Sequence, residues 1–278
     1  MDSHQRYPGT PVEIARSFWQ NRRLIWQLSR RDVVGRYRGS LMGLAWSFFN
    51  PLLMLSVYTF VFLAVFKSRW DVSGGGAEDE ANFAVILFAG MIVHGLFAEC
   101  ANRAPGLILA NVNYVKKVVF PLEILPWVAL ASALFHALIS LGVLLAAQAV
   151  ISRQLPWTVV FIPFVMLPLL LGTIGFAWFL SAIGVFVRDI GHTMSIFTAV
   201  LLFLSPVFYP VSALPAGFQR WFVLNPLAFI IEAARASLIF GRVPDWVAWT
   251  GYFTGSLAFA WAGFWWFQRT RKGFADAL

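Results

Sequence analysis

Charged residues are scarce in this chain. Only 12% of its 278 residues are Asp, Glu, Lys or Arg, whereas 59% are hydrophobic. A soluble domain usually has about 25% charged residues, so this composition leaves too little polar surface for a soluble fold. The sequence therefore predicts an all-α integral membrane protein that forms a single membrane domain over residues 1–278.

Positive charge is present, but its pattern does not indicate nucleic-acid binding. The net charge is +8, and the Lys and Arg residues lie at the ends of apolar runs rather than along a groove with interleaved aromatic side chains. This placement is typical of residues that flank membrane spans. We therefore expect no nucleic-acid partner.

Residues for catalysis and metal binding are also missing. Cys100 is the only cysteine, and the four histidines belong to no H-E-x-x-H or similar metal motif. No G-x-x-x-x-G-K-[ST] loop occurs, so the usual P-loop ATPase site is absent. We expect no metal, no cofactor bound by this chain and no enzymatic activity of its own. For His94 and His136, neutral side chains bonded to a neighbouring helix are favoured over a functional role.

Carboxylates within the apolar segments are few and isolated. Glu99, Glu123 and Glu232 each lie near a predicted helix end, which gives little support to a proton-driven transporter. The predicted spans also hold no convergent acid, base or metal set for a membrane-embedded transferase. Glu99 is expected at the inner end of its span or facing a protein cavity.

Long uncharged runs define the spans. A helix rises about 1.5 Å per residue, so about 20 apolar residues cross a bilayer. Six membrane-spanning helices are predicted, at residues 41–66, 83–102, 124–151, 160–187, 193–209 and 246–268.

The charges orient these spans. Arg30, Arg31, Arg36 and Arg38 precede the first span, and positive residues are enriched in short cytoplasmic segments. Both termini are therefore predicted to be cytoplasmic in a multi-pass protein of the bacterial inner membrane. The loop with the glycine triplet at residues 74–76 is expected to be periplasmic.

Residues 211–245 are apolar but carry several charges. They form either a seventh crossing or two short periplasmic re-entrant helices that turn at Asn225-Pro226. A seventh crossing would place the basic C-terminus outside, so we favour the re-entrant pair. Residues 11–29 have an apolar and a polar face, which predicts an amphipathic helix in the cytoplasmic membrane interface. A helix packed on protein is the alternative.

Aromatic residues are abundant, at 17% of the chain. Most are expected in interfacial belts and lipid-facing packing. The remainder suit a transport path, because aromatic faces contact the apolar faces of sugar rings without trapping them in strong hydrogen bonds. The candidates for lining such a channel are Trp46, Phe49, Tyr58, Phe203 and Phe208.

Three segments resemble a known family. They are RDVVGRYRGSLMGLAW at residues 31–46 with Asn50-Pro51-Leu52 following, NYVKKVVFPLEILP at residues 113–126, and SPVFYP at residues 205–210. Together they resemble the permease (transmembrane) subunit of type-2 ABC exporters of cell-surface polysaccharide, the O-antigen (Wzm) group and its teichoic-acid and capsule relatives. The resemblance covers nearly the whole chain.

This resemblance implies a function and partners. It implies a homodimer that forms a channel, and two copies of a separate ATPase subunit that bind ATP and Mg. The cargo would be a polysaccharide linked to undecaprenyl pyrophosphate, moved from cytoplasm to periplasm. An exporter of teichoic acid, capsule, lipid or drug is the alternative, and a membrane-embedded transferase is less favoured.

Two groups of residues follow as candidate sites. The resemblance implies that a cytoplasmic coupling helix at residues 107–118 docks on the ATPase, with Asn111, Asn113, Tyr114, Lys116 and Lys117 as the contact residues. A connector lying on anionic lipid headgroups is the alternative. The basic segment Arg30, Arg31, Arg36, Tyr37 and Arg38 is predicted to bind the pyrophosphate, because guanidinium groups pair with phosphate oxygens. Its alternative role is to set topology and hold membrane lipid.

Overall fold

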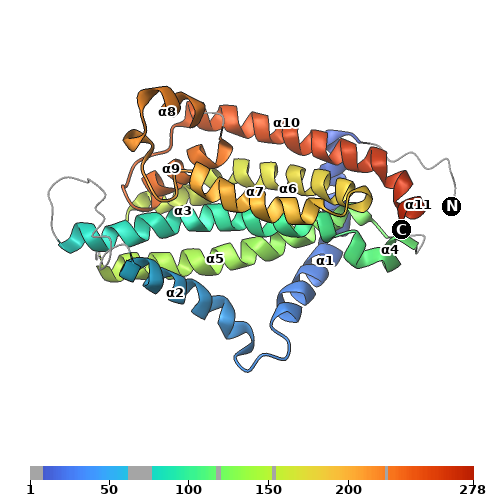
Figure 1. Cartoon of the computed structure of the whole chain (residues 1–278), viewed down its shortest axis with the longest axis horizontal. Helices are drawn as coiled ribbons and strands as arrows, with labels where there is room; N and C mark the ends of the chain where they lie inside the picture. Colours follow the sequence, from blue (N-terminus) through green and yellow to red (C-terminus); the bar gives the residue numbers. More distant parts are fainter. Residues whose placement is uncertain (1–8, 62–76, 117–119, 152–154, 223–224) are drawn as a thin grey trace.

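The computed structural model describes residues 9–61, 77–116, 120–151, 155–222 and 225–278. Within these ranges every regular element is helical (Figure 1). The glycine triplet, residues 62–66 of the predicted first span and Lys117 fall outside the described residues.

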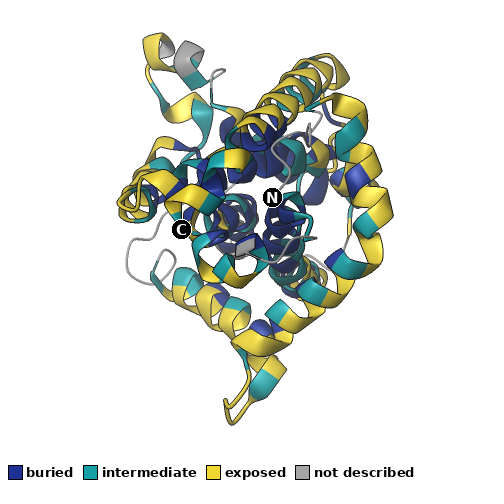
Figure 2. Cartoon of the chain, turned by 90° about the vertical axis from the view of Figure 1, so that its right-hand side faces the viewer, coloured by how far each residue is buried: buried dark blue, intermediate teal, exposed yellow. Residues whose placement is uncertain are grey.

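Five helices run side by side along the long axis of the molecule (Figure 1). They are α3 (Ala77–Arg103), α5 (Leu125–Ile151), α6 (Ile162–Phe186), α7 (Ile190–Leu204) and α10 (Trp246–Thr270). Among the described residues, Phe83–Gly106, Leu122–Ile151 and Trp157–Phe186 are long and apolar enough to cross a membrane, whereas Ile190–Leu204 is apolar but shorter. Buried residues gather along the axis of this bundle and its outer faces are exposed (Figure 2).

Short elements close both ends of the bundle (Figure 1). One end carries the 3-10 turn Val211–Ala213, α8 (Ala216–Phe222) and α9 (Pro226–Leu238). Asn225 caps α9 by accepting a hydrogen bond from the Leu227 N–H at 3.0 Å, so α9 begins directly after Asn225. The opposite end carries α4 (Val112–Lys116) and α11 (Phe274–Ala277).

Several helix bounds differ from those expected from sequence. Helix α1 (Pro11–Arg36) continues well past residue 29, because Ile25, Ser29 and Val33 keep one face buried at a spacing of one turn. Helix α7 ends at Leu204 rather than near residue 209, since Pro206 has no N–H to continue the helix.

The first predicted span and the coupling segment are also less regular than expected. Helix α2 (Trp46–Thr59) begins after a turn in which Gly39 and Gly43 have φ of 86° and 52°, values that favour glycine. The segment at residues 107–118 contains a 3-10 turn, Leu109–Asn111, before α4 and is not one helix.

Helices α6 and α10 are in backbone contact. A Cβ added at Gly175 would lie 2.7 Å from the Ala260 Cα, and one added at Gly263 would clash with the Gly175 carbonyl. Small residues allow helices in a membrane to approach this closely. The contact also places the fully buried Trp178 ring 5.0 Å from that of Phe264.

This contact predicts that Gly263→Ala destabilises the protein by about 1–3 kcal/mol, because the methyl group forces the two backbones apart. Gly251→Ala is the matched control on the same helix, since nothing lies within 4 Å of the Cβ that it would add. Thermal unfolding of the purified protein in detergent measures both. Equal midpoints for the two variants would contradict the close contact.

Candidate functional site

A polar cluster joins α1, α3 and α5. Arg103 donates two hydrogen bonds to Asp32, each of 2.8 Å, and the Ser132 hydroxyl donates a third of 2.7 Å. Burial raises the pKa of Asp32, but the bonds from Ser132 and Arg103 outweigh burial, so the pKa lies below its usual value. Asp32 is therefore an ionised anchor between α1 and the bundle.

Glu99 is the centre of the second half of this cluster. It accepts a hydrogen bond from Arg36 Nη2 at 2.7 Å, and His136 Nδ1 lies 3.1 Å from each carboxylate oxygen. The Tyr37 hydroxyl is 3.2 Å from His136 Nε2. A neutral histidine with its proton on Nδ1 satisfies all of these contacts, donating to Glu99 and accepting from Tyr37.

One contact in this group is not a hydrogen bond in that tautomer. Arg36 Nη1 lies 3.3 Å from His136 Nδ1, and two N–H groups cannot bond to each other. The Arg36–Glu99 contact is shorter and joins opposite charges, so the Arg36 guanidinium pairs with Glu99 and not with His136. Burial raises the pKa of Tyr37, which keeps its hydroxyl protonated as a donor.

The five residues predicted to bind pyrophosphate do not converge on one point. Arg36 and Tyr37 belong to the polar cluster, whereas Arg31 donates to the Tyr114 hydroxyl at 3.2 Å. Arg30 and Arg38 are exposed. All four arginines of the segment are therefore exposed, with Arg31 bonded to Tyr114 and Arg36 paired with Glu99.

Three of the predicted channel-lining aromatics do meet. Tyr58, Phe203 and Phe208 line an apolar cavity of about 430 Å³ together with Val57, Val61 and Tyr209. The rings of Phe203 and Phe208 stack with centroids 5.6 Å apart. Trp46 and Phe49 lie apart from this cavity, exposed near the start of α2.

The predicted coupling residues are partly anchored. The rings of Tyr114 and Phe120 stack at 4.2 Å, Asn111 donates to the Leu107 carbonyl at 2.8 Å, and Asn113 is exposed. Lys116 ends α4, but its side chain is outside what the structure describes, as is Lys117. Near this segment, Arg271 pairs with Glu123 at 2.5 Å and so ties the C-terminal region to the 3-10 turn Leu122–Ile124 before α5.

Arg235 on α9 is fully buried. It donates to the carbonyls of Ile86 at 3.0 Å, Pro206 at 2.6 Å and Val207 at 2.6 Å. A Glu232 oxygen 3.2 Å away balances its charge. The Arg235 guanidinium and these three carbonyl contacts, here called the Arg235 fork, connect α9, α3 and residues 206–207 immediately before Phe208. The fork therefore fixes one wall of the aromatic cavity.

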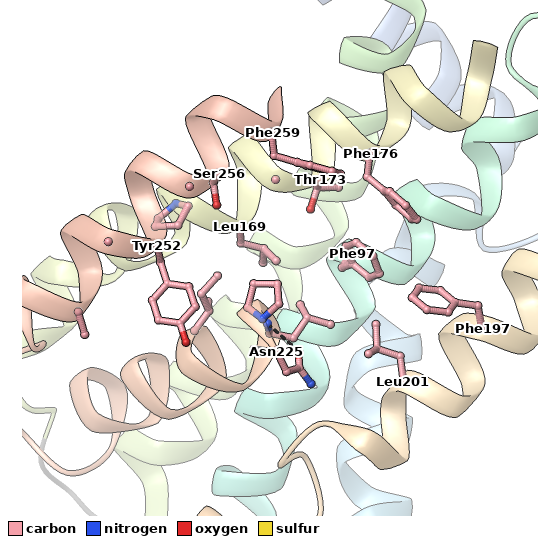
Figure 3. Close-up of a pocket in the computed structure, with 18 residues that line it drawn as sticks. Phe97, Leu169, Thr173, Phe176, Phe197, Leu201, Asn225, Tyr252, Ser256 and Phe259 are labelled. Carbon is pink, nitrogen blue, oxygen red and sulfur yellow. Dashed lines mark hydrogen bonds between the residues drawn. The ribbon is translucent and has the colours of Figure 1, made fainter. Parts of the chain in front are cut away.

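A second cavity, of about 560 Å³, lies among α3, α6, α7, α9 and α10 (Figure 3). Its lining includes the rings of Phe97, Phe176 and Phe259, and it holds no formally charged residue. It suits an apolar chain rather than a charged headgroup. No set of three or more His, Cys, Asp or Glu side chains that could hold a metal occurs within the described ranges.

Sequence reasoning missed the polar cluster because its members are far apart along the chain. Asp32 and Ser132 are 100 positions apart, and Glu99 and His136 are 37 apart. An available signal was the presence of Glu99 and His136 within otherwise apolar segments. The expected inter-helix bond is found for His94, whose Nε2 lies 3.0 Å from the Thr198 carbonyl oxygen on α7, but His136 has charged partners.

The bundle, with three helices long and apolar enough to cross a membrane within the described residues, is that of a multi-pass α-helical membrane protein. The model of the ABC-2 type transporter family matches residues 23–239, so the chain belongs to that family. The chain is 28% identical over 269 residues to the O-antigen export system permease protein RfbA of Myxococcus xanthus, covering 96% of this chain and 100% of that protein.

Two further relatives extend the comparison. A Klebsiella pneumoniae protein also named O-antigen export system permease protein RfbA is 26% identical, with 90% of this chain and 93% of that protein covered. The capsule polysaccharide export inner-membrane protein CtrC of Neisseria meningitidis is 25% identical, with 79% and 82% covered.

The Arg235 fork predicts that Arg235→Lys lowers the free energy of unfolding by about 1.5–3 kcal/mol, because an ammonium group cannot reach carbonyls on two segments at once. Arg188→Lys, at an exposed arginine, should change it by less than about 0.5 kcal/mol. Thermal unfolding of the two purified variants measures the difference. An Arg235→Lys variant that unfolds at the same temperature as the parent would contradict this role of the Arg235 fork.

Proposed function

We propose that this chain is the permease subunit of an ATP-driven exporter that moves lipid-linked polysaccharide from the cytoplasm to the periplasm. The proposal rests on two findings. The chain belongs to the ABC-2 transporter family over residues 23–239, and it is similar to an O-antigen export permease along nearly its whole length. The carrier would be undecaprenyl pyrophosphate. Capsule polysaccharide is the alternative cargo, since CtrC is a capsule export protein.

A separate ATPase supplies the energy in this proposal, as membership of an ABC family implies. Residues 107–118 are the docking element, with Asn113 exposed on it. Tyr114 supports this role because it accepts a hydrogen bond from Arg31 and stacks on Phe120. A displacement of this element by the ATPase would therefore reach α1 directly.

The transport path is proposed to lie between two copies of this chain. Exposed apolar side chains on α2 and α7 support such a contact, with Phe203 exposed by 66% beside the aromatic cavity. A channel wall of aromatic rings suits the apolar faces of sugar rings. The cavity thus supplies a surface along which a polysaccharide can slide.

The proposed topology has six spans and cytoplasmic termini. The fifth and sixth spans correspond to α7 and α10, and part of the first corresponds to α2. The short helices α8 and α9, the second of which begins directly after Asn225, support a region that enters the membrane without crossing it. Arg269, Arg271 and Lys272 at the end of α10 are compatible with a cytoplasmic C-terminus.

The function is tested by polysaccharide export in a strain that lacks this chain and carries variants on a plasmid. Loss of the chain should remove the polymer from the cell surface. The double variant Phe203→Ala, Phe208→Ala should lower export about tenfold, because each lost ring contact contributes about 0.5–1.5 kcal/mol. Surface polymer is quantified by sugar analysis at equal membrane abundance of the permease.

Phe164→Ala is the matched control, since Phe164 is exposed on α6 and does not line the aromatic cavity. It should export at the parental rate. Unchanged surface polysaccharide in the strain without the chain would refute the function. Equal export by the double variant and the control would refute only the path.

The topology is tested with single introduced cysteines. Ser212→Cys, at an exposed position before α8, should react with an impermeant maleimide added outside the inner membrane, whereas Ala277→Cys should not. Cys100 is fully buried and gives no background. Labelling at position 277 in intact spheroplasts would place the C-terminus outside and overturn the model.

A further inference from the structure

The Arg36–Glu99 ion pair is open to exchange. The two side chains are in contact at 2.7 Å, yet 36% of the Arg36 side chain and 22% of the Glu99 side chain remain accessible. By contrast, the Arg271–Glu123 pair is only 12% and 13% exposed. An anion arriving from the α1 side can therefore reach the Arg36 guanidinium without unfolding any element.

Glu99 has other partners if Arg36 leaves it. Arg103 Nη1 is buried, lies 3.9 Å from a Glu99 oxygen, and has no hydrogen-bond partner within the described part of the chain. Its Nη2 is already engaged by Asp32, so Nη1 is the group left to serve Glu99. The His136 N–H, already within bonding distance, completes the replacement.

We propose that Glu99 is an internal counter-ion that occupies Arg36 until the pyrophosphate of the lipid carrier displaces it, which makes Glu99 a specificity-determining residue. This inference rests on the proposed function. In the exchange, Arg36 turns from the carboxylate to the phosphate oxygens, and Glu99 closes the gap to Arg103. No partly buried charge is left unpaired before or after, which keeps the cost of exchange low.

Competition with Glu99 explains how one class of lipid would be selected. The bilayer contains abundant phosphodiester headgroups with a single negative charge, and these would also be attracted to free arginines. A pyrophosphate carries more charge and offers paired oxygens to the planar guanidinium. Competition with Glu99 lowers the apparent affinity for both headgroups by the same factor, so the weaker phosphodiester no longer occupies the site whereas the pyrophosphate still binds.

The test uses the full chain in phosphatidylcholine nanodiscs, with binding of undecaprenyl pyrophosphate and of phosphatidylglycerol measured separately. Glu99→Gln should raise the affinity for both lipids by about tenfold, so that phosphatidylglycerol occupies the site at concentrations at which it does not bind the parent. Glu99→Asp, which keeps the charge, should retain the parental affinities for both lipids.

Glu123→Gln is the matched control, because it removes the carboxylate of another arginine pair and should leave both affinities unchanged. Inorganic pyrophosphate as a competitor separates headgroup recognition from recognition of the polyprenyl chain. Parental affinities in Glu99→Gln, or a parent that binds neither lipid, overturn the exchange. Neither result bears on whether loss of the chain abolishes surface polysaccharide, so the proposed function is judged independently.

Discussion

The ion pair between Asp32 and Arg103 connects α1 to the helix bundle. Charged groups at the edge of a bilayer are costly unless they are paired, and here each side chain lies on a different helix. Ser132 adds a third helix through its hydroxyl. The angle at which α1 leaves the bundle, and therefore the position of Arg36 and Tyr37, depends on this contact.

The long helices could be predicted from sequence because a single property defines them. Uncharged runs longer than a bilayer is thick leave helix as the only satisfactory backbone structure, which accounts for α5 and α6. Helix α10 has the length of a span, yet it is rich in Trp, Thr and Gly and is less apolar than α5 and α6. Its packing on α6 instead depends on the facing positions Gly175 and Gly263, which no periodic pattern reveals.

The sites were predictable only in part, for a related reason. Listing the aromatics of two predicted spans was enough to name Tyr58, Phe203 and Phe208, which line one cavity. Trp46 and Phe49 do not line this cavity, because they lie near the start of α2, just after the turn that contains Gly39 and Gly43. Likewise, the sequence alone identifies the basic segment. It does not show that Arg36 is paired while Arg30 stays exposed, because the partner of Arg36, Glu99, lies on another helix.

The Arg235 fork has a mechanical consequence for the aromatic cavity. Because one guanidinium binds carbonyls of α3 and of residues 206–207, these segments and α9 move as one rigid body. Phe208 belongs to that body, whereas Tyr58 lies on α2, which follows a glycine-containing turn. Widening of the cavity therefore requires a tilt of α2 against a stationary wall, and the end of α1 is the point from which that tilt can be controlled.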